Sequence, residues 1–365
     1  MKALMIGGTG PSGVPIVQGL VERGYAVEML HSGRNEVPET PGEVVHIHAD
    51  VYDPDALTEV LGGREWDLVI AAYGRLRKVA ELLEGRAGRF VSMGGLPALK
   101  GYMNPYAFQP AGMPVPTPVD GPLVRDEALD TKGHRIVLTE EAVLRHQPRA
   151  THFRYAFVYG ARQPVPREWL IVRRILDGRP HIIVPDGGQT LHHFGYNENL
   201  AHAILLSIDN PDNTYGQIYN AADSEVLTLR AVVELIATGL DHDLEIINMP
   251  WELAIPARPL ITQPETTHRV VDTTKMQRDF GYRDLVPPRE AVVRTAKWLA
   301  ENPPSAEQEN ILEDPFDYAA EDALIEQWKK ALATMQPVEW KTLPGYGMAY
   351  SGPGGRARTK ATFEE

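Results

Sequence analysis

The stretch that decides the fold is "MIGGTGPSGVPIVQGLVERG", Met5–Gly24, near the start of the 365-residue chain. Its glycines follow a G-x-x-G-x-x-G spacing between an apolar run and a segment with helical spacing. Gly7 permits a tight turn, Gly10 lets the backbone approach a ligand, and Gly13 lets the helix pack closely on the strand. The helix N-terminus then offers N–H donors to phosphates. The pattern predicts a dinucleotide-binding turn made of Gly7, Thr9, Gly10, Pro11, Ser12 and Gly13.

Short apolar runs alternate with helix-like segments through the first half of the chain, which predicts a parallel sheet covered on both faces. Strands are predicted at "KALMIGG", "AVEMLHS", "VVHIHAD", "DLVIAAY", "RFVSMGG" and "HFRYAFVYG". The fold class is therefore α/β, a doubly wound Rossmann fold with a smaller C-terminal α/β substrate lobe. We expect a dinucleotide-binding domain at residues 1–160, a lobe at 161–300, and a C-terminal helix with a Gly/Pro-rich tail at 301–365.

Composition limits the compartment and the partners. The formal charge of −13 argues against a nucleic-acid partner or an anionic membrane surface, since both require a basic face. The chain has no cysteine, no signal-peptide pattern and no apolar run of about 18 residues, so we expect a cytoplasmic protein. We find no Cys/His spacing typical of a metal site and expect no metal.

The end of the second strand distinguishes NAD from NADP, because NAD sites place a carboxylate there to accept from the ribose 2′-hydroxyl. Here the sequence is His31-Ser32-Gly33-Arg34, without an acid. Ser32 and Arg34 would hold a 2′-phosphate, which favours NADP(H), with NAD(H) as the second choice. Asp50 is suited to the adenine amino group or, alternatively, to capping the next helix. Further cofactor contacts are predicted at Val51 and Ala71.

Several later motifs, in the expected order, resemble the extended short-chain dehydrogenases/reductases, the group of NAD(P)-dependent epimerases and dehydratases. They are the "HFRYAFVYGARQ", "GYNENLAHAIL", "GQIYNAAD" and "HRVVDTTKMQRDFGY" stretches. The resemblance covers roughly residues 1–300 and implies hydride transfer with proton exchange by a Tyr in a Y-x-x-x-K helix, assisted by a Ser or Thr. It also implies a homodimer, a small-molecule substrate and cofactor contacts at Ser92 and Tyr155.

The chain departs from this pattern at the catalytic positions. The family's helix corresponds to "LDTKGHRIVLTEEAVL", which places Lys132 at the Tyr position and Ile136 at the Lys position. After the fifth strand, Ser92 is kept, but the usual third-position hydroxyl falls on Gly94. The standard Ser/Tyr/Lys set is therefore replaced.

Lys132 is the first candidate to replace the proton-transfer group, because desolvation and an oxidised nicotinamide would favour its neutral amine. Tyr102 is the second, in a Pro-rich loop that leaves the fifth strand at the ligand-binding end. Lys100, two residues earlier, is expected to lower the pKa of the Tyr102 phenol. The alternatives are an exposed lysine and a structural tyrosine.

Basic and aromatic residues beyond this helix suggest an anionic substrate. We predict substrate contacts at Gly94, Arg135, Arg167, Trp169 and His193. The alternative for the arginines is surface ion pairing. The favoured function is an atypical oxidoreductase or epimerase of a small polar carbonyl, hydroxyl or sugar-nucleotide-like compound. The alternative is a catalytically retired NAD(P)-binding redox sensor that acts through a partner.

Overall fold

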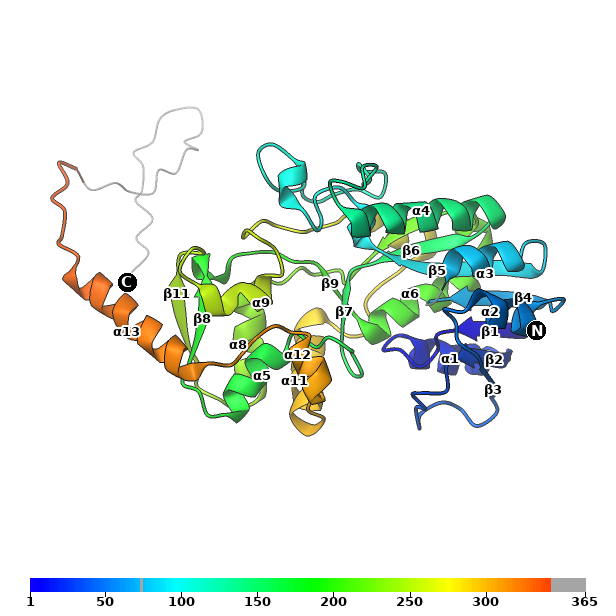
Figure 1. Ribbon diagram of the computed structural model, residues 1–365, viewed down its shortest axis with the longest axis horizontal. Helices are drawn as coiled ribbons and strands as arrows, with labels where there is room; N and C mark the ends of the chain where they lie inside the picture. Colours follow the sequence, from blue (N-terminus) through cyan, green and yellow to red (C-terminus); the bar gives the residue numbers. More distant parts are fainter. Residues whose placement is uncertain (73–74, 343–365) are drawn as a thin grey trace, which may run out of the picture. The chain divides into compact units, whose positions relative to one another are not determined.

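The protein is built on a sheet of seven parallel strands in the order β10-β6-β5-β4-β1-β2-β3 (Figure 1). The strands are β1 (Lys2–Ile6), β2 (Ala26–His31), β3 (Val45–His48), β4 (Trp66–Ala71), β5 (Ala87–Gly95), β6 (Thr151–Tyr155) and β10 (Ile218–Ala221). The computed structural model describes residues 1–72 and 75–342. The predicted α/β fold class is confirmed.

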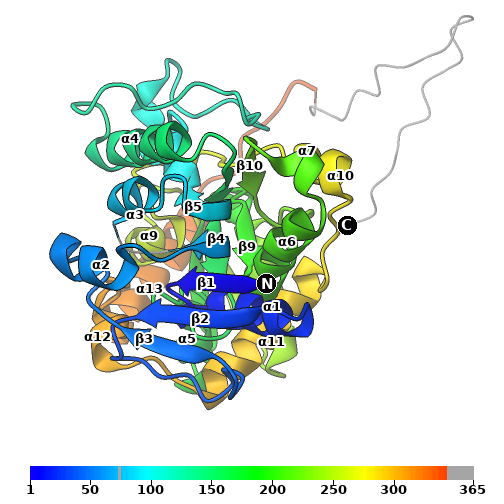
Figure 2. The same ribbon diagram turned by 90° about the vertical axis from the view of Figure 1, so that its right-hand side faces the viewer.

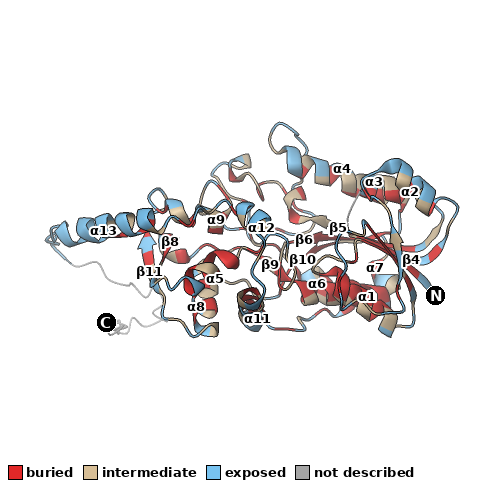
Figure 3. Ribbon diagram, turned by 60° about the horizontal axis from the view of Figure 1, so that its bottom comes forward, coloured by how far each residue is buried: buried red, intermediate tan, exposed pale blue. Residues whose placement is uncertain are grey.

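Helices cover both faces of the sheet (Figure 2). One face carries α1 (Gly13–Glu22), α6 (Asn197–Asp209) and α10 (Thr274–Phe280), and the other carries α2 (Pro54–Leu61), α3 (Leu76–Leu82) and α4 (Thr131–His146). Successive residues of a strand point to opposite faces. In β1, Ala3 and Met5 pack toward α1 while Leu4 and Ile6 pack toward α2 and α3. The inner strands of the sheet consist mainly of buried residues (Figure 3), which explains their nearly continuous apolar sequences. The edge strand β3 is largely exposed.

The strand order reverses between β1 and β4. From β1 the chain continues outward to β2 and β3, whereas β4 returns to the other side of β1 and leads on to β5 and β6. In open α/β sheets, ligands bind outside the carboxyl ends of the strands at this switch point. The loops after β1, β2, β4 and β5 therefore surround the expected cofactor crevice.

The second half of the chain supplies a smaller group of elements and one strand of the central sheet. The predicted strand "GQIYNAAD" forms β10, which pairs with β6. The other elements are β7 (Phe157–Tyr159), α5 (Trp169–Leu176), β8 (His181–Pro185), β9 (Phe194–Tyr196), α7 (Pro211–Thr214), α8 (Leu229–Gly239), β11 (Glu245–Met249), α9 (Arg258–Ile261), α11 (Pro288–Glu301) and α12 (Ala306–Asn310). The domain boundaries expected at residues 160 and 300 stay predictions.

The chain divides into two units, Met1–Phe316 and Asp317–Glu365. The second contains α13 (Tyr318–Thr334), at the place predicted for a C-terminal helix. The predicted "SGPGGRARTKATFEE" tail lies outside the described residues. Within the described part of the chain, none of the helices combines the length and the apolar character that a membrane span requires.

Candidate functional site

The glycine turn between β1 and α1 has the geometry that a phosphate cradle requires. Gly7 has φ +87°, and its N–H donates to the Leu30 carbonyl at 3.0 Å. A Cβ at Gly13 would lie 2.5 Å from the Gly8 carbonyl oxygen, so only glycine lets α1 begin this close to the turn. A Cβ at Gly10 would meet nothing nearer than 3.8 Å. The backbone at Gly10 is therefore open to a ligand beside the N-terminus of α1.

The turn is joined to a helix far away in the sequence. Asn197, the first residue of α6, donates from Nδ2 to the Pro11 carbonyl at 3.1 Å. Ser12 precedes α1 without capping it through its side chain. Tyr155 ends β6, and burial raises the pKa of its phenol. These contacts fix the strand ends that surround the expected cofactor crevice.

The predicted NADP determinants lie after β2. Ser32 and Arg34 are exposed, and Arg34 forms no ion pair with any residue in the described ranges. Asp50 follows β3, and its Oδ1 accepts from the Tyr52 N–H at 2.8 Å. The alternative that Asp50 caps the next helix is wrong, because Asp53 caps α2 and accepts from the Asp55 N–H. Of the other predicted contacts in this region, Val51 and Ala71 are buried.

At the end of β5, the Ser92 hydroxyl is buried and lies 2.8 Å from His152 Nδ1. His152 lies 3.6 Å from Glu140, which in turn accepts two bonds of 2.7 Å from Arg154. Burial lowers the pKa of His152 to about 4, so the ring is neutral at physiological pH. A Cβ at Gly94 would lie 2.6 Å from His152 Nε2. The histidine therefore occupies the space that a side chain at Gly94 would need.

The structure does not bring the three catalytic candidates together. Lys132 lies exposed at the start of α4, next to the N-cap Asp130. Lys100 places its Nζ 4.9 Å from the centre of the Phe108 ring. Tyr102 is buried, and its hydroxyl lies 3.4 Å from His192 Nε2.

The expectation that Lys100 lowers the pKa of Tyr102 is wrong. Burial raises the pKa of this phenol, and the opposing positive charges belong to Arg269 and Arg167. Lys100 instead contacts Phe108 on the loop between β5 and α4.

A mainly apolar cavity in the second half of the chain contains an unusual group of charges. Arg167, His192 and Arg269 line it together with Phe194 and Asp223. The Arg167 guanidinium lies 3.7 Å from the centre of the Phe157 ring, and its Nη1 is buried without a hydrogen-bond partner. Sequence reasoning identified Arg167 but missed Arg269, whose only signal was its place in the late "HRVVDTTK" motif.

Arg269 is buried and forms no ion pair with a carboxylate of the described residues. Its Nη2 donates to His192 Nδ1 at 2.9 Å, to the Ile261 carbonyl and to Thr262, whereas its Nε and Nη1 have no partner. Burial lowers the pKa of Arg269 to about 9 and that of Arg167 to about 10. Among the described residues, neither arginine forms an ion pair with a carboxylate, although Glu168, Asp223 and Glu225 also line the cavity. Burial raises the pKa of Glu168, and the charge of Arg167 opposes that rise.

Two of the other predicted substrate residues make hydrogen bonds within the protein. Trp169 donates from Nε1 to Glu309 at 2.7 Å. His193 contacts the Asp223 carbonyl at 2.7 Å, and its Nδ1 accepts from the Val271 N–H. Arg135 is exposed on α4. Their contacts with a substrate stay predictions.

Comparison with known proteins shows what this sequence and this fold are similar to. No protein-family model matches the sequence. The uncharacterized protein YbjS of Escherichia coli K12 is 27% identical over 178 residues, which cover 43% of this chain and 51% of that protein. The chain thus spans about half the length of this curated relative.

Solved structures match over most of their length. UDP-glucose 4-epimerase from Thermotoga maritima, with UDP-glucose, has a TM-score of 0.64 and 17% identity over 82% of this chain and 99% of that one. dTDP-glucose 4,6-dehydratase from Bacillus anthracis, in complex with NAD, has a TM-score of 0.63 and 16% identity over 86% and 99%. A UDP-galactose 4-epimerase has a TM-score of 0.61 and 18% identity over 83% and 100%.

The chain has the fold of the extended short-chain dehydrogenases/reductases. The recognition made from the glycine turn and the later motifs is thereby confirmed at the level of the fold. Within this fold, the present chain has the His152 contact behind Ser92 and the two buried arginines of the cavity.

Asp223, in the wall of the same cavity, provides a test of the site's electrostatics. It accepts hydrogen bonds from the Tyr159 hydroxyl at 2.8 Å, the Tyr196 N–H at 2.9 Å and Asn199 Nδ2 at 3.0 Å. Even so, burial raises the pKa of Asp223 to about 7. The folded protein therefore keeps a proton there that the unfolded chain releases near pH 4.

The Asp223→Asn variant should change how stability depends on pH. The wild-type carboxyl stabilises the folded state at low pH, and this contribution is lost as pH rises toward 7. The unfolding free energy of the variant minus that of the wild type should be larger at about pH 8 than at about pH 5, by on the order of 2–3 kcal/mol. Urea denaturation at both pH values measures the difference, with exposed Asp212→Asn as the control. An equal difference at both pH values would contradict a raised pKa.

Proposed function

We propose that the protein is an NADP(H)-preferring oxidoreductase or epimerase acting on an anionic hydroxyl or carbonyl compound of the sugar-nucleotide type. The observation that carries this proposal is the pair of buried arginines, Arg167 and Arg269, in one cavity without carboxylate partners. The fold, and the NAD and UDP-glucose named with similar structures, support the reaction class.

The turn around Gly10 fits a nicotinamide dinucleotide. The open backbone at Gly10 and the N-terminus of α1 would hold its pyrophosphate, and Ser32 with Arg34 would hold a 2′-phosphate. When bound, the nicotinamide would accept or supply a hydride. The chain itself must then bind the substrate and move one proton.

The buried arginines favour an anion as the substrate's binding group. A buried charge without a partner is costly, and a bound phosphate or carboxylate would offset the cost at both guanidinium groups. Nη1 is unpartnered in each arginine. The Phe194 ring in the cavity wall would pack against the apolar parts of a base or sugar. Phe157, under the Arg167 guanidinium, would hold that guanidinium in place.

Tyr102 has the best-supported environment for the proton-transfer role. Because Arg269 donates to His192 Nδ1, the neutral imidazole carries its proton on Nε2, which points to the Tyr102 hydroxyl. Burial, followed by the charges of Arg269 and Arg167, holds the pKa of His192 well below its usual value. The Tyr102 oxygen thus accepts from the histidine and keeps its own proton to donate.

The cofactor preference can be measured with NADPH and NADH through nicotinamide fluorescence. We expect tighter binding of NADPH. Arg34→Ala should weaken it about 10-fold or more, the effect of one lost charged hydrogen bond of about 1.5–3 kcal/mol, and should leave NADH unchanged. Preference for NADH would overturn the role of Arg34 alone, whereas binding of neither would overturn the cofactor assignment.

The anion site is tested with Arg167→Gln. Removing an unpaired buried charge should leave the melting temperature unchanged or raise it, while the affinity for UDP-glucose falls about 10-fold or more. Calorimetry of UDP-glucose binding, with uncharged glucose as the comparison ligand, measures this. Arg173→Gln is the matched control, because Arg173 lies on α5 and is already paired with Glu309. Equal losses in both variants would argue against the site.

The proton-transfer assignment is tested by comparing Tyr102→Phe with Lys132→Ala in the turnover of any accepted carbonyl or sugar-nucleotide substrate. Loss of general acid–base catalysis should lower kcat by about 100- to 10,000-fold in Tyr102→Phe. Lys132→Ala removes only an exposed amine and should keep nearly full activity. The reverse result would restore Lys132 as the catalytic group. Cofactor binding without any turnover of a broad substrate panel would favour the redox sensor.

A further inference from the structure

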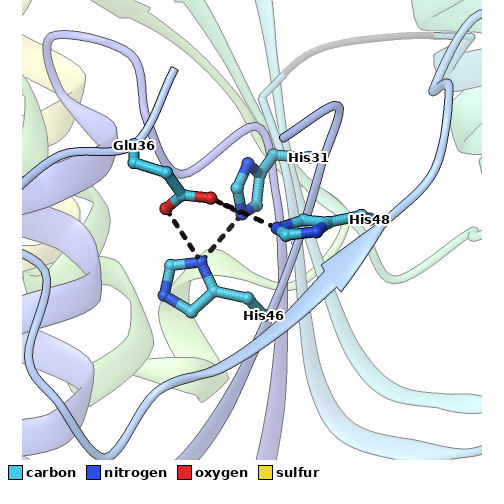
Figure 4. Close-up of side chains that lie close together, drawn as sticks. All are labelled: His31, Glu36, His46 and His48. Atoms are coloured by element: carbon cyan, nitrogen blue, oxygen red, sulfur yellow. Dashed lines mark hydrogen bonds and ion pairs between the residues drawn. The ribbon is translucent and has the colours of Figure 1, made fainter. Parts of the chain in front are cut away.

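Three histidines and one glutamate converge at the edge of the central sheet, away from the arginine cavity. Figure 4 shows His31, His46, His48 and Glu36 pointing toward one another. His31 Nε2 lies 2.9 Å from His46 Nδ1, and the Glu36 carboxylate lies 3.2 Å from both His46 Nδ1 and His48 Nε2. All four potential ligand atoms lie within 4.8 Å of one another.

Strand register explains why these residues meet. His31 is the last residue of β2 and pairs directly with His48 of β3. His46 and His48 are two positions apart on one strand, so their side chains leave the same face. Glu36 reaches the histidines from the loop that connects β2 to β3. Both Glu36 and His48 are more than half exposed, which leaves an entry path from solvent.

The hydrogen bonds within the cluster are not self-consistent without an added cation. The Gly33 N–H donates to His31 Nδ1 at 3.2 Å, which leaves the His31 proton on Nε2, directed at His46 Nδ1. His46 Nδ1 is then an acceptor, yet it faces the Glu36 carboxylate, which is also an acceptor. A positive ion among these lone pairs would turn the repulsion into attraction.

We propose that His31, Glu36, His46 and His48 form a binding site for a divalent transition-metal ion, with zinc as the best match. Zinc–nitrogen bonds of about 2.0–2.1 Å in a tetrahedron place neighbouring ligand atoms about 3.3 Å apart. The observed separations of 2.9, 3.2, 3.2 and 3.9 Å surround this value. Imidazole nitrogens suit zinc and its neighbours, whereas Mg²⁺ and Ca²⁺ take oxygen ligands.

Metal binding has a defined local consequence. Coordination through His31 Nε2 moves the ring proton to Nδ1, so the contact with the Gly33 N–H opens. Four protein ligands close the coordination sphere, as in structural zinc sites. The metal would tie the loop at residues 32–44 to β3, and this role does not depend on the proposed enzymatic function.

The site is tested by a calorimetric titration in which Zn²⁺ is added to the full-length protein after treatment with a chelator. We expect one Zn²⁺ per chain and no response to Mg²⁺. His48→Ala and Glu36→Gln change exposed side chains, so the fold should persist by circular dichroism while zinc affinity falls at least about 10- to 100-fold. His146→Ala is the matched control, because His146 and Glu84 form an exposed His–carboxylate pair with a 2.9 Å contact.

Two further readouts locate the ion. Cobalt(II) bound to the wild type should give the intense visible absorption of tetrahedral coordination, which His48→Ala should abolish. Zinc should also slow tryptic cleavage after the exposed Arg34, within the loop that the metal would tie down. Zinc binding that His48→Ala and Glu36→Gln leave unchanged, half an equivalent of zinc shared between two chains, or no zinc binding by the wild type would each overturn the proposal. So would a loss of zinc affinity in His146→Ala as large as the loss in His48→Ala.

Discussion

The close approach of α1 to the glycine turn is the constraint on which the rest of the structure depends. At Gly13 the helix begins so near the Gly8 carbonyl that a single methyl group would not fit. This contact directs the N-terminus of α1 toward the carboxyl ends of β1 and β4, where the strand order reverses. Asn197 then joins α6 to the same turn through the Pro11 carbonyl.

Two buried arginines of this chain differ in how their charge is compensated. Arg154 is neutralised by two hydrogen bonds to Glu140, and the pair stabilises the contact between β6 and α4. Arg269 has only neutral partners, although its burial is equally complete. An internal ion pair explains the first without any ligand. Among the described residues, the second is offset only by neutral hydrogen-bond acceptors and by the rings of Tyr102 and Phe157, whose centres lie 5.5 and 5.6 Å from its guanidinium carbon. Uncompensated charge of this kind is typical of binding sites rather than of cores.

The sequence predicted the sheet well because strands buried on both faces leave a local signature, and the glycine spacing identified the first turn. The cavity and the histidine cluster were harder to predict because they depend on distant pairings. Arg269 meets His192 only through the fold, and His46 becomes a neighbour of His31 only in the β2–β3 register. The sequence shows the "HIH" of β3, but the cluster can be recognised only once the fold places Glu36 and His31 beside these two histidines. Tyr102 was identified correctly as a loop residue, but its arginine neighbours could not be foreseen.

The residues near the end of β5 are physically connected to His152 of β6. Without a side chain at Gly94, His152 can approach β5, and it takes up the Ser92 hydroxyl that the family would direct toward a substrate oxygen. The neutral histidine is kept in place by burial and by Glu140 beyond it. Under the proposed function, Tyr102 would supply the hydroxyl group for proton exchange, since it lies in the loop that follows the same strand. Its contact with His192 joins it to a wall of the arginine cavity, so that anion binding and proton exchange would share one group of side chains.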